Sequence, residues 1–220
     1  TGNYNIGSNI YSFSLLSYIG RANYSYDGKY LFSATFRRDG SSRFGSNNPW
    51  GNFPAFSAGW RLSKETFMKK IDVINDLKLR LSWGKSGNQE IGNYAFASSL
   101  GNSFNYVLGT SQTLASGVAP SSLTNPDLKW ETTTQSNVGL DLSMWENRFM
   151  LSANYYIKKT KDILLQVPIP QLSGITVFPT RNIGSMLNKG FELELGYKQS
   201  FGNLKIDLNG NFSVNKNKVL

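Results

Sequence analysis

The chain has 220 residues, of which 40% are apolar, 14% aromatic and 17% charged, with a formal net charge of +9. This composition has too many apolar residues and too few charged ones for a disordered chain, so the chain is expected to fold. Histidine and cysteine are both absent, which removes the usual general base, thiolate chemistry and the commonest transition-metal ligand. We therefore expect no enzyme activity, no metal and no cofactor. The positive charges are spread at one or two to a segment rather than clustered, which argues against nucleic-acid binding.

No run of about 18 consecutive apolar residues occurs, so a membrane-spanning helix is excluded and only strands could cross a bilayer. The first residues are polar and rich in Gly and Asn, and they lack the basic and apolar regions of a signal peptide. It stops at Leu220, directly after a strand-like segment. We therefore expect a fragment of a longer protein.

Apolar and polar residues alternate along several segments, as in strands with one apolar and one polar face. The first segment begins at Leu16 and ends before Asp27-Gly28, a hairpin signal because both central residues of a type I′ turn need positive φ. The later segments are residues 30–37, 56–62, 77–83, 137–142, 149–158, 191–198 and 204–214. The sequence thus predicts about eight antiparallel strands.

The connections distinguish a membrane barrel from a soluble β-sandwich, which alternates in the same way. Tight links alternate with long ones: the tight links are residues 27–28, 63–75, 145–148 and 199–203, and the long ones are 38–51, 86–127 and 161–189. The link 63–75 is predicted to hold a helical turn around Phe67. One short rim and one long rim are typical of an up-and-down transmembrane β-barrel.

Aromatic residues gather near the predicted strand ends, as in the interfacial girdles of membrane proteins. The alternative is that each ring only packs on a cross-strand neighbour. Near the short rim they are Tyr26, Tyr30, Trp60, Trp145, Phe149 and Phe201, and near the long rim Phe36, Trp83 and Trp130.

The two strand faces predict a lipid side and a lumen side. Lys78, Arg80, Glu192 and Glu194 are expected in the lumen. The two glutamates are interpreted as lumen wall balanced by Lys189 and Lys198, because glycosidase chemistry needs carboxylates opposed across a cleft. The residues expected to face lipid are Leu77, Leu79, Leu81, Val138, Leu140, Leu193 and Leu195.

The longest link, between Trp83 and Trp130, is too long for an unstructured connection in a compact soluble domain but ordinary in a barrel. It is rich in Gly, Asn and Ser and carries Tyr94, Phe96, Phe104 and Tyr106. Such rings can stack on sugars, so these four residues are candidate substrate or partner contacts on an extracellular loop. The alternative is a plain surface loop.

Several blocks, in order, resemble the SusC/RagA family of TonB-linked outer-membrane transporters. The blocks are GRANYSYDGKYLFSATFRRDGSSRFG (residues 20–45), FPAFSAGWRLSKE (53–65), LKLRLSWGKSGNQEIGNY (77–94), NPDLKWETTTQSNVGLDL (125–142), YYIKKTKDILL (155–165) and NIGSMLNKGFELEL (182–195).

This resemblance implies an all-β barrel of about 22 strands with a plug in its lumen. Residues 1–220 would supply about eight of them, whereas the plug, the signal peptide and the final strands would lie outside this sequence. It also implies an outer-membrane location, coupling to TonB through the plug and a SusD-like surface lipoprotein as partner. The implied function is import of a bulky nutrient, a glycan-derived oligosaccharide in preference to a peptide. A structural or adhesive barrel without transport is the alternative.

The segment RDGSSRFG is a hallmark of the family on an extracellular loop. Its residues Arg38, Asp39, Gly40, Arg43 and Phe44 are interpreted as structural. We expect Asp39 and Arg43 to lock the loop through a charge-assisted hydrogen bond.

Overall fold

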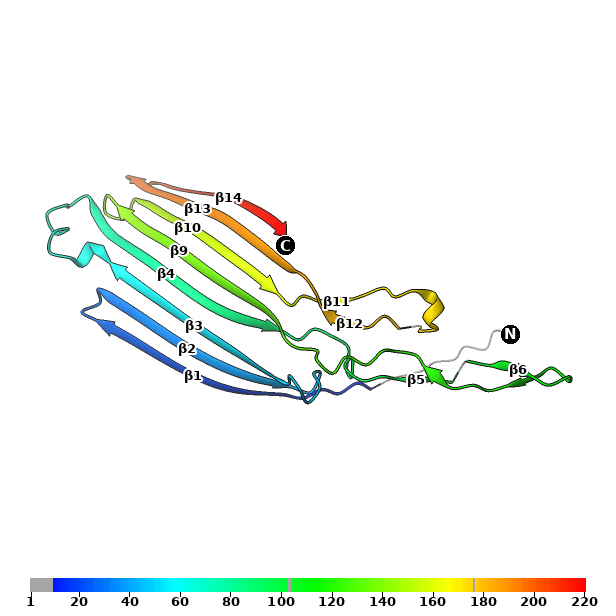
Figure 1. The fold of residues 1–220 in the computed structure, drawn as a ribbon. Helices are drawn as coiled ribbons and strands as arrows, with labels where there is room; N and C mark the ends of the chain where they lie inside the picture. The colour runs from blue at the N-terminus through cyan, green and yellow to red at the C-terminus, as the bar shows by residue number, and fades with distance from the viewer. Residues whose placement is uncertain (1–9, 103, 176) are drawn as a thin grey trace.

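The computed structural model describes residues 10–102, 104–175 and 177–220. Its body is one 8-stranded antiparallel sheet whose strands are neighbours in chain order, β1-β2-β3-β4-β9-β10-β13-β14 (Figure 1). The predicted all-β meander of about eight strands is confirmed. The strands are β1 (Leu15–Tyr26), β2 (Tyr30–Ser41), β3 (Trp50–Arg61), β4 (Ile74–Asn88), β9 (Glu131–Met144), β10 (Phe149–Lys161), β13 (Ser185–Phe201) and β14 (Leu204–Val219).

The predicted alternation of short and long connections is also confirmed. Residues 27–29, 62–73, 145–148 and 202–203 turn at one rim, and residues 42–49, 89–130 and 162–184 connect strands at the other. The long connections contain short two-stranded ladders that project beyond the sheet (Figure 1). These ladders pair β5 (Leu100–Gly101) with β8 (Ala119–Pro120), β6 (Tyr106–Leu108) with β7 (Thr113–Ala115), and β11 (Leu164–Gln166) with β12 (Thr180–Asn182).

Two turns at the short rim follow from local sequence. Asp27 and Gly28 have φ of 51° and 57°, and the Lys29 N–H donates to the Tyr26 carbonyl at 2.9 Å, as the type I′ signal predicts. The next link begins with a 3₁₀ turn, η1 (Leu62–Lys64). A further turn encloses Phe67, as predicted, and is closed by the Met68 N–H, which donates to the Glu65 carbonyl at 3.1 Å.

The register keeps the two faces of the sheet distinct across all eight strands. One row on the apolar face runs through Tyr26, Tyr30, Trp60, Leu79, Leu140, Ala153, Leu193 and Phe212. The adjacent row on the polar face runs through Ser25, Leu31, Gly59, Arg80, Gly139, Asn154, Glu192 and Ser213. Apart from Leu31, the second row is polar, charged or glycine.

The apolar face has no covering layer among the described residues. Phe32, Leu81, Val138 and Phe212 are 47 to 57% exposed, whereas a β-sandwich would bury such side chains against a second sheet. The strands contain 12 to 17 residues, more than the 9 to 11 or so that a tilted transmembrane strand needs. No helix in the described part of the chain is long and apolar enough to span a membrane.

Candidate functional site

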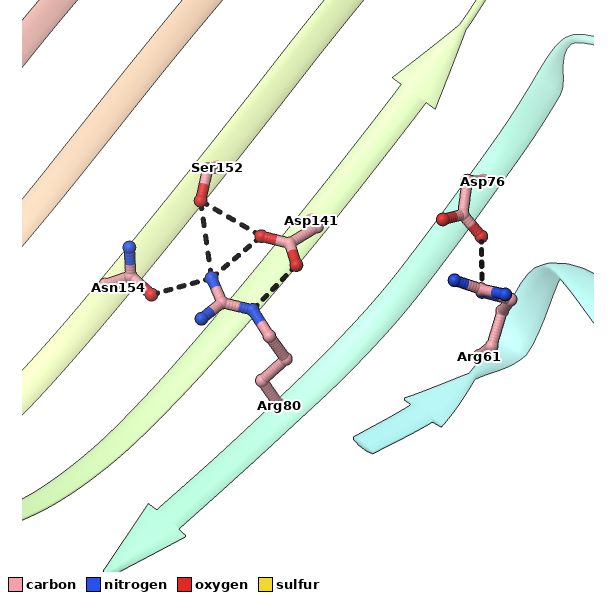
Figure 2. A network of polar contacts seen from close by, with 6 residues as sticks. All are labelled: Arg61, Asp76, Arg80, Asp141, Ser152 and Asn154. Atoms are coloured by element: carbon pink, nitrogen blue, oxygen red, sulfur yellow. Dashed lines mark hydrogen bonds and ion pairs between the residues drawn. The ribbon is translucent and has the colours of Figure 1, made fainter. Parts of the chain in front are cut away.

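The polar face carries a hydrogen-bonded network centred on Arg80 (Figure 2). Arg80 Nε lies 2.6 Å from Asp141 Oδ2, and its Nη2 donates to Asp141 Oδ1 at 2.7 Å. The same Nη2 donates to Asn154 Oδ1 at 2.9 Å and to Ser152 Oγ at 3.3 Å. An ion pair between β4 and β9 is thus extended by hydrogen bonds to β10, which fixes the side chains on this part of the polar face.

Gly139 makes room for this network. It lies directly opposite Arg80, and a Cβ at position 139 would stand 2.9 Å from Arg80 Nη2 and 2.6 Å from Asn154 Oδ1. Any larger residue would push the guanidinium away from its partners.

Elsewhere on this face, neutral amides and hydroxyls dominate. Gln135 donates to Asn137, and Asn137 donates to Ser82, each at 2.9 Å. Towards the short rim lies a hollow of about 560 Å³, whose lining includes Asp141, Ser152 and Glu194 together with Met150 and three leucines. This face therefore offers hydrogen-bonding side chains over a wide area.

Glu192 and Glu194 lie on the polar face, opposite Asn154 and Ser152, but their predicted charge balance is wrong. Lys198 lies 3.4 Å from Asp207 instead, and Lys189 is on the apolar face, opposite Ile157. For Lys189 the prediction failed because nearness in sequence ignored the alternation of faces along a strand; for Lys198 it failed because Asp207 is its cross-strand partner.

At the long rim, four apolar side chains form the buried junction cluster: Phe44, Phe53, Leu128 and Trp130. The Trp130 ring lies 5.2 Å from that of Phe44 and 5.4 Å from that of Phe53, measured between centroids. Trp130 Nε1 donates to the carbonyl of Pro49 at 3.2 Å. The segments RDGSSRFG and NPDLKW, which are far apart in the sequence, thus pack on one another.

Glycines make this packing possible. A Cβ on Gly51 or Gly87 would overlap the Phe53 ring, and one on Gly45 would stand 3.2 Å from Phe96. These glycines are needed for close approach of rings to backbone.

The predicted hydrogen bond between Asp39 and Arg43 is wrong. Asp39 is buried, and its Oδ2 lies 2.8 Å from Arg37 Nε. Arg43 reaches the opposite way: its Nη1 donates to the Gln89 carbonyl at 3.3 Å and lies 3.3 Å from Glu90 Oε1. Asp39 and Arg43 therefore stabilise different parts of the structure. Asp39 pairs with Arg37 because Arg37 is two residues away on the same face of the strand.

The remaining hallmark residues have distinct places. Phe44 belongs to the junction cluster. Arg38 points to the apolar face, with its guanidinium 4.9 Å from the centre of the Trp50 ring. A Cβ on Gly40 would stand 2.8 Å from the same ring, so Gly40 leaves space for the Trp50 side chain.

Hydrogen bonds join the three long connections into one unit. Asn47 Nδ2 in the first connection donates to Asp127 Oδ1 in the second at 3.0 Å. Lys129 Nζ in the second connection lies 3.1 Å from Asp162 Oδ1 in the third connection. Asn182 Nδ2, also in the third connection, donates to the Lys129 carbonyl at 2.7 Å. The long rim is therefore cross-linked rather than a set of independent loops.

The four candidate aromatic residues fall into two groups. Tyr94 and Phe96 are neighbours, with ring centroids 6.4 Å apart; Tyr94 is exposed, whereas Phe96 packs against the junction cluster. Phe104 and Tyr106 both adjoin Gly117, farther out on the same connection. Tyr106 is exposed and Phe104 is half-buried.

A hollow that sequence reasoning missed lies at the base of these connections. It measures about 600 Å³, and its lining includes Tyr11, Arg43, Glu90, Asn93 and Gln166. These residues come from distant parts of the chain, so no local motif could have indicated it.

At the short rim, Glu65 links two girdle aromatics. Its Oε1 accepts from the Tyr30 hydroxyl at 2.7 Å and from Trp60 Nε1 at 3.0 Å. These two hydrogen bonds, in that order, together with nearby Lys29, hold the pKa of Glu65 below its ordinary value. The ring tips are thereby fixed at the expected height of the membrane interface.

An uncovered apolar face, a polar inner face and rims of unequal loop length together define a sector of a transmembrane β-barrel. A family model described as "TonB dependent receptor-like, beta-barrel" matches residues 1–219. The chain belongs to this family and lies in the outer membrane.

The chain is 42% identical to TonB-dependent receptor P39 of Formosa agariphila, over 97% of this chain and 20% of that protein. It is 39% identical to TonB-dependent receptor SusC of Bacteroides thetaiotaomicron, over 94% of this chain and 21% of that protein. These relatives are receptors, not enzymes. The chain spans about a fifth of their length.

Among solved structures, that of the RagAB peptide transporter superposes with a TM-score of 0.81 at 32% identity, covering 94% of this chain and 22% of that one. The structure of the siderophore receptor PirA from Pseudomonas aeruginosa superposes with a TM-score of 0.58 at 12% identity, over 92% of this chain and 34% of that one. This similarity supports the fold alone.

Proposed function

We propose that the whole protein is a TonB-dependent importer that takes up a bulky nutrient together with a SusD-like surface lipoprotein. The observation that carries this proposal is the similarity to receptor SusC and to the RagAB transporter along almost the whole chain. Residues 1–220 would form about eight of about 22 strands. The plug and its contact with TonB would come from outside these residues.

For the substrate, we propose a glycan-derived oligosaccharide in preference to a peptide. The lumen wall supports this choice, because amide and hydroxyl side chains such as Asn137, Gln135 and Ser82 can exchange hydrogen bonds with sugar hydroxyls.

The joined long connections are the proposed contact surface for substrate and lipoprotein. Tyr94 and Tyr106 expose their rings there and can stack on sugar faces. Phe96 is better explained as an anchor of the junction cluster, and Phe104 as an anchor of the outer ladder beside Gly117.

Uptake by whole cells tests the proposal. Cells that lack the gene are complemented with the full-length protein, and import of labelled neutral oligosaccharides is compared with that of labelled peptides. We expect energy-dependent uptake of oligosaccharide and co-purification of a lipoprotein. Peptide uptake alone would overturn the substrate class, and no energy-dependent uptake of either would favour a structural or adhesive barrel.

Two alanine variants refine the test. Tyr94→Ala with Tyr106→Ala should weaken uptake about tenfold, since aromatic contacts are worth roughly 0.5 to 1.5 kcal/mol beyond area burial. Tyr24→Ala is the matched control, because Tyr24 is an exposed ring on the apolar face of β1. Equal effects of the two changes would exclude a ligand role for the loop tyrosines.

A further inference from the structure

The register separates the charges of the eight strands by face and by end. Within these described strands, every Asp and Glu lies on the polar face. The apolar face carries only positive charges, all near the long rim. The positive residues on it are Arg38, Lys85, Lys159, Lys161, Lys189, Lys216 and Lys218. Charges that are evenly spread in sequence are therefore gathered into one band in space.

The band is continuous across neighbouring strands. Lys85 and Lys159 both pair with Thr134, and Lys159 and Lys218 both pair with Leu187, so these three lysines lie in one cross-strand row. We call Lys85, Lys159, Lys161, Lys189, Lys216 and Lys218 the lysine band. None of them takes part in an ion pair within the described chain.

One pair of lysines in the band lacks a neutralising partner within the eight strands and would be stabilised by an anion from outside the chain. Lys189 and Lys216 are directly opposite each other in the ladder between β13 and β14, and like charges in that position destabilise a sheet. Both side chains are exposed, and the strands bring no carboxylate to this face. The repulsion is removed when anionic groups lie between the two ammonium ions.

The height of the band identifies where those anions lie. Below Lys189 on the same face come Phe191 and Leu193. From Phe191 to Phe201 this face of β13 runs for ten residues at about 3.3 Å each, which is about 33 Å along the strand and about 25 Å in height for a strand tilted by about 40°. An outer-membrane barrel has an apolar band about 25 Å tall, so the lysines stand near its upper edge, level with lipid headgroups.

We propose that the lysine band binds phosphate groups of lipid headgroups in the outer leaflet. The occupant must present phosphate to the lysines and hydrocarbon to the rings beneath, which Tyr155, Phe191 and Val214 leave exposed. A membrane lipid has both parts. Lysine is a flexible point charge that can extend to a phosphate while its stem stays on apolar surface.

Lipid retention by the full-length protein tests this proposal. The protein is purified in mild detergent, exposed to diphosphorylated lipid A or to the same glycolipid without phosphates, and bound lipid is counted by native mass spectrometry. The triple variant Lys159→Gln, Lys189→Gln and Lys216→Gln should retain at least tenfold less lipid A, because each lysine near an anionic surface contributes roughly fivefold.

The control variant changes three lysines of the polar face, Lys78→Gln, Lys158→Gln and Lys205→Gln. It should retain lipid A as the unchanged protein does. The proposal is overturned if the control loses as much lipid, if the triple variant loses none, or if the dephosphorylated glycolipid binds equally well.

If the triple variant fails to assemble, as judged by heat-modified gel migration, Lys216→Gln alone and a salt titration of the unchanged protein replace it. Added salt should release lipid A, because screening weakens exposed charge pairs. Retention that does not respond to salt would contradict the proposal.

Discussion

Leu79 and Arg80 are sequence neighbours with opposite surroundings. Leu79 lies between Trp60 and Leu140 on the apolar face, whereas Arg80 is paired on the polar face. Leu79→Arg should impair barrel assembly, because a charge near the bilayer midplane costs about 2 to 4 kcal/mol on the lipid face.

Arg80→Leu should be milder, since Asp141 keeps access to the lumen after its partner is lost: a third of its side chain is exposed. Heat-modified gel migration of the full-length variants measures both effects. Equal loss of the folded form in the two variants would contradict the assignment of the faces.

Glu65 gives the short rim a defined pH response. Its folded-state pKa is lowered by the hydrogen bonds from Tyr30 and Trp60. Its contribution to stability is therefore complete above the unfolded-state pKa and is lost as pH falls through the folded-state value.

Glu65→Gln should lower the melting temperature at neutral pH, and the difference from the unchanged protein should shrink as the solution becomes acidic. Thermal melts of the full-length protein across this range provide the measurement. A difference that stays constant at all pH values would show that the carboxylate charge is not involved.

At the scale of elements, the junction cluster holds the long connections to the ends of β2 and β3. Phe44→Ala should cost about 3 to 5 kcal/mol, and that loss should be local, since the sheet hydrogen bonds lie elsewhere. We expect faster protease cleavage within residues 92–118 and an unchanged heat-modified shift. Phe32→Ala is the matched control on β2, because the Phe32 ring lies on the apolar face and half of it is exposed; cleavage that rises equally in both variants would argue against a local junction.

The centres of the strands could be predicted from sequence, but their ends could not. Residues 77–83 alternate clearly, yet β4 continues to Asn88 and β9 already begins at Glu131. These extensions are rich in Thr, Gly and Ser, which lack an apolar face to alternate with a polar one. They are held by the neighbouring strand, for instance Ser86 opposite Thr133.

The site shows a similar division. The polar face was predictable, because alternation decides which way Arg80 points. Its partners were not, since Asp141 and Asn154 approach Arg80 only through the register of three strands. The junction cluster was also invisible in the sequence, because Phe44 and Trp130 are brought together by loops whose paths depend on the whole rim.

At the scale of the whole molecule, the two faces meet different solvents. The chain contains no cysteine, so single cysteines can be introduced one at a time. Positions Lys78, Glu192 and Glu194 should react with a water-soluble thiol reagent in membranes, whereas Leu77, Leu140 and Leu193 should be protected by lipid. Labelling in the reverse pattern would contradict the barrel.

The longest connection reaches farthest from the sheet (Figure 1), and its removal separates transport from folding. Gly101 pairs with Ala119 in the ladder between β5 and β8, so deleting residues 102–117 shortens the connection where its two arms already meet. Phe96 and the junction cluster stay in place. The barrel should therefore assemble and keep its heat-modified shift.

Uptake should nevertheless fall or the lipoprotein should be held less tightly, because Phe104, Tyr106 and the outer ladder are gone. Loops of this length are retained where they bind or gate, since an exposed chain that makes no contact adds only entropy cost. Growth on the native nutrient and pull-down of the lipoprotein measure the two outcomes. The control is a changed turn at the short rim, replacement of Gly202-Asn203 by Asn-Gly, which should change neither. Normal growth with the lipoprotein fully bound, after loss of residues 102–117, would refute a role for this connection in import.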